Sequence, residues 1–323
     1  MGVGVALARA ARVRLPPRAP RHFGLLADET AANGLERIAL GQLDLAIELL
    51  RGESSTPPER AVHETRKALK RLRALLRLLG DELDSKRVAR ERAVLRDAAR
   101  ELAGARDAEV TVGTLDDLLR RHPRKLGRRR GLTELREHLQ AECRAATAQT
   151  LGDGATRALL ADELCALRAR VSHWRLPDRS AERLVGAGLE RIYRDGRAGH
   201  RRAGRRKAGP SALHRWRRHV KDLRYALEIL DVGDLSSDGA NRRIARLARR
   251  ADRLGELLGE EHDLMLLGEQ VCSHKPLKRR KRTRKRLLRA IARRRASLRE
   301  QALREGERLF ERKPRRFVRR LRV

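Results

Sequence analysis

The sequence predicts an all-α protein built by tandem duplication of a helical-bundle unit. Apolar residues recur every three or four positions in nearly every segment, as in amphipathic helices, and no segment has a convincing strand pattern. One predicted helix also occurs in two copies, because residues 62–79 align with residues 213–230 at a shift of 151 positions. Seven of the eighteen aligned positions are identical, and four of these seven are basic. If only packing had kept the two copies alike, the leucines would match and the surface residues would differ.

Size and charge agree with a helical protein that binds a polyanion. The chain has 323 residues, which is enough for two helical domains of ordinary size. It carries 78 Lys and Arg against 43 Asp and Glu, a net charge of +35, which predicts attraction to nucleic acid, anionic membrane or polyphosphate. Hydrophobic residues make up 40% of the chain but aromatic residues only 2%, so the cores must consist mainly of Leu, Ala, Val and Ile.

The first half is expected to contain an arm, a first bundle and a connector. Residues 1–22 carry Arg and Pro and lack the apolar stretch of a secretory signal, so we expect a basic disordered arm. A first bundle is expected at 23–153 and a connector helix at 154–177. Pro and Gly positions, together with the helical spacing of apolar residues, predict helices at 29–51, 56–80, 84–121, 133–151 and 155–173.

The second half repeats this order. We expect a second bundle at 178–311 and a frayed basic tail at 312–323. Helices are predicted at 179–195, 211–231, 240–271 and 280–310, with a basic, glycine-rich loop at Gly196–Gly209 and a polar turn at 233–239.

The long third helices of the two halves also match. Leu102 and Arg106-Asp107 align with Leu258 and His262-Asp263 at a shift of 156 positions. The five-residue difference from the shift of 151 falls in the turn before this helix, where changes in length cost little. The duplication therefore extends beyond the repeated helix.

The repeated helix carries two stripes that both survive the shift of 151. The apolar stripe comprises Val62, Thr65, Leu69, Leu72, Leu76 and Leu79, aligned with Leu213, Trp216, Val220, Leu223, Leu227 and Leu230. The basic stripe comprises His63, Arg66, Lys70 and Arg73, aligned with His214, Arg217, Lys221 and Arg224. Steps of three and four residues keep each stripe on one side of a helix, about 100° from the other. Each copy should bury one side and place a cation about every 5 Å along its edge, which suits a linear polyanion.

The motif H-x-x-R-x-x-x-K-x-L-R near the start of each half, with the downstream R-D and L-G-x-x-H-D elements, resembles the CHAD domain, the conserved histidine α-helical domain. The resemblance extends over nearly the whole chain. It implies two pseudo-symmetric antiparallel four-helix bundles whose basic helix faces line a central groove. It also implies binding of inorganic polyphosphate and, in bacteria, association with polyphosphate granules in the cytoplasm.

The resemblance also gives the candidate polyphosphate ligands. Lys67 and Arg218, which are basic in both copies, are added to the matching positions His63, Arg66, Lys70, Arg73, His214, Arg217, Lys221 and Arg224. Arg106 and His262 are further candidates, each oriented toward the groove by the aspartate that follows it. The alternative for these two is a helix-surface ion pair worth well under ~1 kcal/mol. Arg71 departs from the repeat because its partner position is Asp222, so symmetric use of that position is not expected.

Three functions compatible with the charge can be compared, and non-enzymatic polyphosphate binding is preferred. General nucleic-acid binding is the alternative, but no groove-reading motif is present, and five of the seven aromatic residues lie outside the basic stripes. Non-specific binding of nucleic acid is still expected from the charge alone. A phosphate-transferring enzyme would need a carboxylate cluster for Mg²⁺, which the sequence lacks.

No cofactor, metal or membrane span is expected. His63-Glu64 begins like the zinc motif H-E-x-x-H, but Lys67 occupies the second histidine position, and Cys272-x-His274 is too short a constellation for a metal site. The E-x-E-x-K signature of a fused triphosphate tunnel domain is absent, so a stand-alone CHAD protein is expected. Three scattered cysteines suit a reducing cytoplasm, and no apolar run approaches the ~18 residues of a membrane helix.

Overall fold

The computed structural model describes residues 18–321 apart from positions 81, 128, 153 and 232–238. These residues form helices and no strand, which confirms the predicted all-α class. Most of the predicted arm at 1–22 and of the predicted turn at 233–239 lies outside the described residues. No described helix combines the length and the hydropathy that a bilayer crossing requires. The helices are α1 (Ala31–Arg51), α2 (Pro58–Leu78), α3 (Ser85–Glu101), α4 (Ala103–Arg121), α5 (Pro123–Leu126), α6 (Arg130–Gly152), α7 (Gly154–Val171), α8 (Ala181–Ala203), α9 (Pro210–Leu230), α10 (Gly239–Ser273), α11 (Lys275–Arg279), α12 (Lys281–Leu309) and α13 (Pro314–Leu321).

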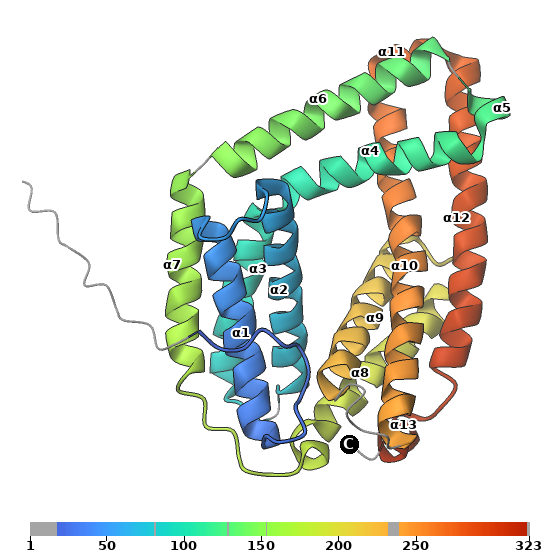
Figure 1. The fold of residues 1–323 in the computed structure, drawn as a ribbon. Helices are drawn as coiled ribbons and strands as arrows, with labels where there is room; N and C mark the ends of the chain where they lie inside the picture. Colours follow the sequence, from blue (N-terminus) through green and yellow to red (C-terminus); the bar gives the residue numbers. More distant parts are fainter. Residues whose placement is uncertain (1–17, 81, 128, 153, 232–238, 322–323) are drawn as a thin grey trace, which may run out of the picture.

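The first half forms a bundle of α1, α2, α3 and α7, on the left of Figure 1. The sequence predicts that α7 connects two bundles, but α7 packs against α1 and α3 as the fourth helix of this one. A buried ion pair of 2.5 Å between Arg168 Nε of α7 and Asp44 Oδ1 of α1 joins the two helices. The described end of the expected arm also follows α1, where Arg18 and Arg21 pair with Glu48.

The prediction of a glycine-rich loop at 196–209 is wrong for its first half, because α8 continues to Ala203. Gly196 and Gly199 are sites of close packing rather than turns. A Cβ at Gly196 would lie 2.6 Å from the ring of Phe310, and one at Gly199 would lie 2.8 Å from Trp216. Rings from later elements therefore require glycine on this face of α8.

The prediction of a frayed tail at 312–323 is also wrong, because Pro314 begins the helix α13. Phe317 and Leu321 are buried, and the Phe317 ring stacks on Tyr193 of α8 with the centroids 3.8 Å apart. α13 contacts both α8 and α10. The tail therefore closes the hydrophobic core of the second half, in which α8, α9 and α10 are the main helices.

The long third helix predicted at 84–121 is broken at Leu102, where α3 ends and α4 begins. Leu102 has φ −87° and ψ 10°, which leaves the helical conformation. Its carbonyl oxygen accepts a hydrogen bond from the guanidinium of Arg66 on α2. The aligned helix of the second half, α10, runs unbroken from Gly239 to Ser273. The break turns α4 away from the first bundle and across the upper part of the molecule (Figure 1).

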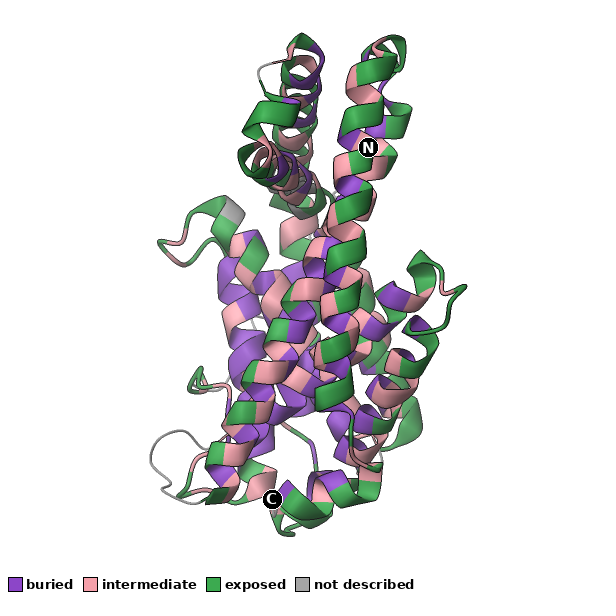
Figure 2. Ribbon diagram, turned by 90° about the vertical axis from the view of Figure 1, so that its right-hand side faces the viewer, coloured by how far each residue is buried: buried purple, intermediate pink, exposed green. Residues whose placement is uncertain are grey.

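The redirected α4 pairs with α6, and this hairpin meets the upper parts of α10 and α12 (Figure 1). Their contact is a second hydrophobic core, in which Leu118 of α4 and Leu135 of α6 share an interior with Leu267 of α10 and Ile291 of α12. The larger core unites the first bundle with α8, α9 and the lower part of α10. Figure 2 shows buried residues dominating the lower body, while exposed residues cover much of the upper end. The first half thus supplies helices to both cores.

Candidate polyanion-binding site

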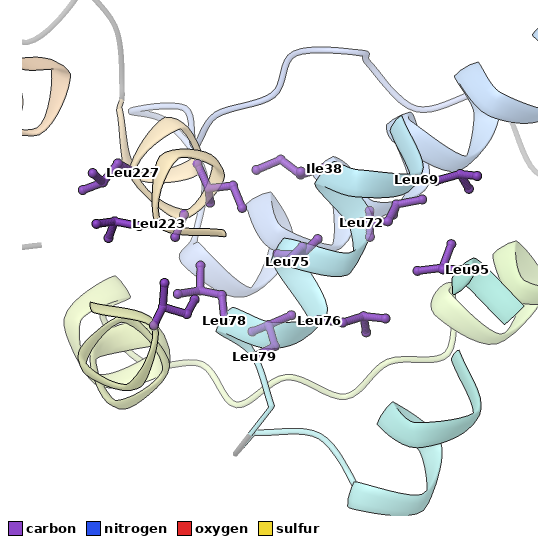
Figure 3. Packing of buried hydrophobic residues seen from close by; sticks show 14 of the residues in the cluster. Ile38, Leu69, Leu72, Leu75, Leu76, Leu78, Leu79, Leu95, Leu223 and Leu227 are labelled. Atoms are coloured by element: carbon purple, nitrogen blue, oxygen red, sulfur yellow. The ribbon is translucent and has the colours of Figure 1, made fainter. Parts of the chain in front are cut away.

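The repeated helices α2 and α9 pack directly against each other. Figure 3 shows Leu78 of α2 in the same buried cluster as Leu223 and Leu227 of α9. All twelve residues of the two predicted apolar stripes are buried, with exposed fractions of 6% or less, which confirms that prediction. The sequence also predicts that the two helices face each other across a groove. Over their C-terminal parts they are instead in contact, because the leucines there belong to one shared core.

Two ion pairs join α2 to α9. Arg77 Nη1 lies 2.9 Å from Asp222 Oδ2, and Arg71 Nη2 lies 3.9 Å from Glu228 Oε2. Residues 71 and 222, like residues 77 and 228, are related by the shift of 151. α2 therefore supplies both cations and α9 both carboxylates, so each of these two repeat positions exchanges a cation in one copy for a carboxylate in the other. This exchange explains why Arg71 and Asp222 depart from the repeat.

Arg66 and Arg217, which occupy the same position of the repeat, contact the same place on the third helix of their halves. Arg66 donates to the Leu102 carbonyl, and its Nη2 lies 3.5 Å from Asp107 Oδ1. Arg217 lies against Gly259, where a Cβ would come within 3.3 Å of Arg217 Nη2. Glycine at position 259 therefore admits the guanidinium while α10 stays unbroken.

The other predicted ligands of the first half are spread along α2. Lys67 pairs with Glu64 of its own helix at 3.5 Å. His63 and Arg73 are exposed. The side chain of Arg106 lies outside what the structure describes, so its role as a ligand stays a prediction.

In the second half three of the six predicted ligands line a pocket of about 450 Å³ between α4, α9, α10 and α12. Arg217, Lys221 and Arg224 of α9 form its basic wall. Arg224 is already neutralised, because its Nε lies 2.6 Å from Glu228 and its Nη1 contacts Asp252. The ion pairs of the described residues include neither Arg217 nor Lys221. These two side chains are therefore the cations of the wall that a ligand can reach without displacing an acid.

Two histidines stand beside this wall. The rings of His214 on α9 and His262 on α10 have centroids 4.7 Å apart. Burial, reinforced by Arg217, His214 and Lys221, lowers the pKa of His262 to about 4. Burial also lowers the pKa of His214, together with the charges of Arg218, Arg217 and Lys221. Both imidazoles are therefore mainly neutral at neutral pH until an anion approaches.

Lys221 experiences the same excess of positive charge. Burial, followed by the charges of Arg217 and Lys70, lowers the pKa of its ammonium group to about 7, against the opposing effect of Asp263. Lys70 belongs to α2, so the structure brings the two basic stripes together at this point. At neutral pH the ammonium is close to half deprotonated, because repulsion and burial disfavour its charge.

The remaining candidates, Arg73 and Arg218, gather around a carboxylate instead. Burial raises the pKa of Asp222, while the charges of Arg77, Arg73, Arg92 and Arg218 oppose that rise. Asp222 is also the ion-pair partner of Arg77 between α2 and α9. These cations are consequently better compensated than those of the pocket wall.

Sequence reasoning missed the acidic side of the pocket. Arg294 of α12 pairs with Glu260 at 2.6 Å there. Of the acids, the sequence indicated only Asp263, as the aspartate that follows His262. α4 reaches the pocket because the chain breaks at Leu102, which no motif signals. Among the residues described, no three acidic, histidine or cysteine side chains gather so as to hold a metal ion. The acidic lining residues are Asp117 of α4 and Asp252, Glu256, Glu260 and Asp263 of α10.

Comparison with known proteins places the chain in a family. No curated protein gives a significant match. The crystal structure of the CHAD domain from the plant Ricinus communis has a similar fold, with a TM-score of 0.58 and 22% identity over 91% of this chain and 96% of that one. The family model of the CHAD domain matches residues 39–272, more than half of the sequence and both copies of the repeated helix. The chain therefore belongs to the CHAD domain family.

Proposed function

We propose that this chain binds inorganic polyphosphate along the pocket wall of Arg217 and Lys221 and the adjoining basic stripe of α2. The observation that supports this most is the lowered pKa of Lys221, to about 7, which burial and the charges of Arg217 and Lys70 cause against the opposing effect of Asp263. A phosphate placed between these groups would relieve their repulsion and return the ammonium to its charged form. The family resemblance supplies the identity of the polyanion.

The chemistry of the wall suits a chain of phosphates. An arginine fork can hold two phosphate oxygens, a lysine supplies a compact charge, and a histidine becomes a cation beside a phosphate. Successive cations on α9 rise by about 4.5 to 6 Å, which matches a polymer whose charges recur every few ångströms. The five acids that also line the pocket repel phosphate. The polymer is therefore proposed to lie along α9 and α2 rather than to fill the pocket.

The proposed binding is non-enzymatic, and the proposed location is the polyphosphate granule of the cytoplasm. In support, the carboxylates Asp252 and Glu260 at the pocket pair with Arg224 and Arg294 rather than grouping to hold Mg²⁺. The other predicted ligands would extend the contact along the polymer, namely His63, Arg66, Lys67, Lys70, Arg73, Arg106, Arg218 and His262.

A competition experiment tests the choice of ligand. Labelled long-chain polyphosphate is displaced from the full chain by unlabelled polyphosphate, duplex DNA or single-stranded RNA at the same salt concentration. Polyphosphate should compete best, because the cluster is local and suits a narrow flexible polymer. Equal competition by all three would reduce the site to a general patch of positive charge.

A pair of matched variants tests the location. Changing Arg66, Lys70, Arg217 and Lys221 to Ala should remove most of the polyphosphate affinity while circular dichroism shows the helices intact. Changing Arg282, Arg286, Arg289 and Arg293 on the exposed side of α12 removes the same number of charges and should cost much less. Similar losses from both variants would show that net charge, and not this cluster, holds the polymer.

A further inference from the structure

A second cationic surface lies on α12, outside the residues matched by the family model. Residues 271–299 contain fourteen Lys and Arg and no Asp or Glu. The fold separates these cations into two sets that the sequence alone does not distinguish. One set faces the protein and is neutralised, while the other faces solvent.

The inward-facing set is used to hold the structure together. Arg294 and Arg295 each lie 2.6 Å from a carboxylate of α10, Glu260 and Glu261 respectively. Arg299 donates to the carbonyl of Ala203 at the end of α8, at 3.0 Å. These arginines fix α12 to its neighbours and are not available to a partner.

The outward-facing set forms what we term the outer basic face. All of its members are exposed, and none takes part in an ion pair of the described residues, in contrast to Arg294 and Arg295. The hollow beside them is lined by α12 residues alone, so the face presents one side of a helix and not two opposed walls. The outer basic face comprises Lys281, Arg282, Lys285, Arg286, Arg289 and Arg293.

Neighbouring elements extend this charge. α5 and α11 both contact α12, and all three meet at the upper end of the molecule in Figure 1. α5 adds the exposed side chains Arg124 and Lys125, and α11 adds Lys278 and Arg279. The outer basic face is thus the central part of a broader cationic end.

We propose that the outer basic face binds the sugar–phosphate backbone of duplex nucleic acid without reading its sequence. From residue 281 to residue 293 the helix rises by about 18 Å, a length of duplex that carries about ten phosphates. Four of the six cations are arginines, whose planar forks engage phosphate oxygens. α12 is held rigidly, because Leu287, Ile291 and Leu298 are buried in the second core, so its cations form a fixed array that complements a rigid double helix.

Two other polyanions fit this surface less well. Single-stranded nucleic acid is normally held by bases stacked on aromatic rings, and residues 271–309 contain no Phe, Trp or Tyr. A helix that docks on an anionic membrane inserts an apolar side, but the apolar side of α12 is already buried against α4, α6 and α10. Charge complementarity and rigidity together favour the duplex.

The chain offers a closely matched control for this proposal. Arg282, Arg286, Arg289 and Arg293 follow steps of four, three and four residues along α12. The exposed arginines Arg242, Arg246, Arg249 and Arg253 follow the same steps along α10. The α10 set lies on a helix that also carries acids, including Asp252 and Glu256, whereas the α12 set has no acid in its segment.

The test compares two full-length variants, each with four Arg→Gln changes, one in the α12 set and one in the α10 set. Binding to a short labelled duplex DNA is measured by fluorescence anisotropy between about 50 and 200 mM salt. The α12 variant should lose at least about tenfold in affinity, and its log–log salt slope should flatten by up to about 3.6, from about 0.9 per phosphate contact. The α10 variant should change the affinity by less than about twofold.

Three results would overturn the proposal. Equal losses in the two variants would show that only net charge attracts the duplex. Tighter binding of single-stranded DNA than of duplex by the parent protein would assign the surface to single strands. Binding to phosphatidylserine vesicles that is abolished in the α12 variant, while duplex binding is retained, would assign it to a membrane. Polyphosphate affinity is measured in parallel and should be preserved in the α12 variant, so failure here is distinguishable from failure of the proposed function.

Discussion

Lys221 is the residue whose chemistry most directly reports a bound anion. Its pKa is about 7 in the free protein because of burial and the charges of Arg217 and Lys70. On the proposed function, a bound phosphate would raise that pKa, so protons should be taken up on binding. Polyphosphate affinity is therefore expected to be highest below about pH 7 and to fall as pH rises through the pKa of the complex.

Two substitutions test whether the charge of Lys221 and its titration cause the pH dependence of polyphosphate affinity. Lys221→Arg stays charged at every pH tested, so the fall in affinity above about pH 8 should disappear. Lys221→Gln should weaken binding by about tenfold near pH 7, since one charge-assisted hydrogen bond is worth about 1.5–3 kcal/mol, and should also lose the fall in affinity above about pH 8. Isothermal titration calorimetry in buffers of different ionisation enthalpy measures the proton uptake. A parent protein that binds without proton uptake in this range would contradict the assignment.

The two histidines of the repeat give a second prediction at this scale. Burial and nearby cations lower the pKa of His214 in the free protein. Phosphate at the start of α2 and α9 should raise the pKa of His63 and His214 relative to the free state, helped by the exposed N–H groups of each helix start. Affinity should therefore weaken modestly from about pH 6 to 8, and the double variant His63→Gln, His214→Gln should bind less tightly and lose most of that change.

Nuclear magnetic resonance checks this directly. The imidazole protons of His63 and His214 are titrated with and without polyphosphate, and exposed His173, in the turn after α7, serves as the internal reference. If both signals titrate identically in the two conditions, the histidines shape the site without binding the polymer.

Among the helices, the contact of α8 with α2 depends on one glycine. A Cβ at Gly188 would overlap the carbonyl oxygen of Leu78, which is backbone and cannot move aside cheaply. Gly188→Ala should therefore lower the free energy of unfolding by about 2–3 kcal/mol, a cost typical of overpacking. Urea unfolding followed by circular dichroism measures the change.

A neighbouring glycine provides the control. Gly186 is on the same helix, but the nearest heavy atom to its added Cβ is Val318 Cγ1 at 3.8 Å, an ordinary contact. Gly186→Ala should be neutral or stabilise by up to about 1 kcal/mol through helix propensity. Equal effects at both positions would mean that helix propensity, and not the approach of α8 to α2, determines stability here.

At the scale of helices, the sequence predicted what local signals specify. α2 begins at Pro58 and α9 at Pro210, because proline favours the first helical position. The end of α8 was predicted wrongly because glycine at 196 and 199 is needed by rings that come later in the chain. The break at Leu102 was also missed, because its carbonyl is capped by Arg66 from another helix. Features fixed by a distant partner leave no local pattern.

For the candidate site, too, the sequence predicted the features that are local to one helix and missed those that depend on distant partners. The spacing of Arg217 and Lys221 predicted that they share a helix side, and the structure places both on one pocket wall. The sequence predicted that the two basic stripes share a groove, but not that Lys70 would lie close enough to Lys221 to lower its pKa, nor that Glu260 and Asp117 would line the same pocket. These positions depend on how α4 docks across α10, which is a property of the assembled molecule.

For the whole molecule, the second core makes the two halves depend on each other. A fragment of residues 18–177 lacks α10 and α12, and so leaves Leu118 and Leu135 of the α4–α6 hairpin without their partners. This fragment should bind the dye anilinonaphthalene sulfonate and self-associate in size-exclusion chromatography, because a large exposed apolar surface favours association. The full chain should do neither.

A variant of the fragment separates exposure of the hairpin from general unfolding. Leu118→Lys with Leu135→Lys removes apolar surface from the hairpin but leaves α1, α2, α3 and α7 unchanged. The fragment carrying both changes should stay monomeric with its helical circular dichroism retained. Persistent self-association would place the exposed surface elsewhere, such as the side of α2 that meets α9.

The same hairpin has a consequence for synthesis on the ribosome. Leu139 of α6 belongs to the second core, whose last-made helix carries Ile291, about 150 residues later. At about 5–20 residues per second, the hairpin waits roughly 8–30 s for its partner helices to emerge. During that interval its leucines are open to chaperones or to another nascent chain. The break at Leu102 thus gives this fold an obligatory late step, in which an early-made hairpin is captured by the last long helix to leave the exit tunnel.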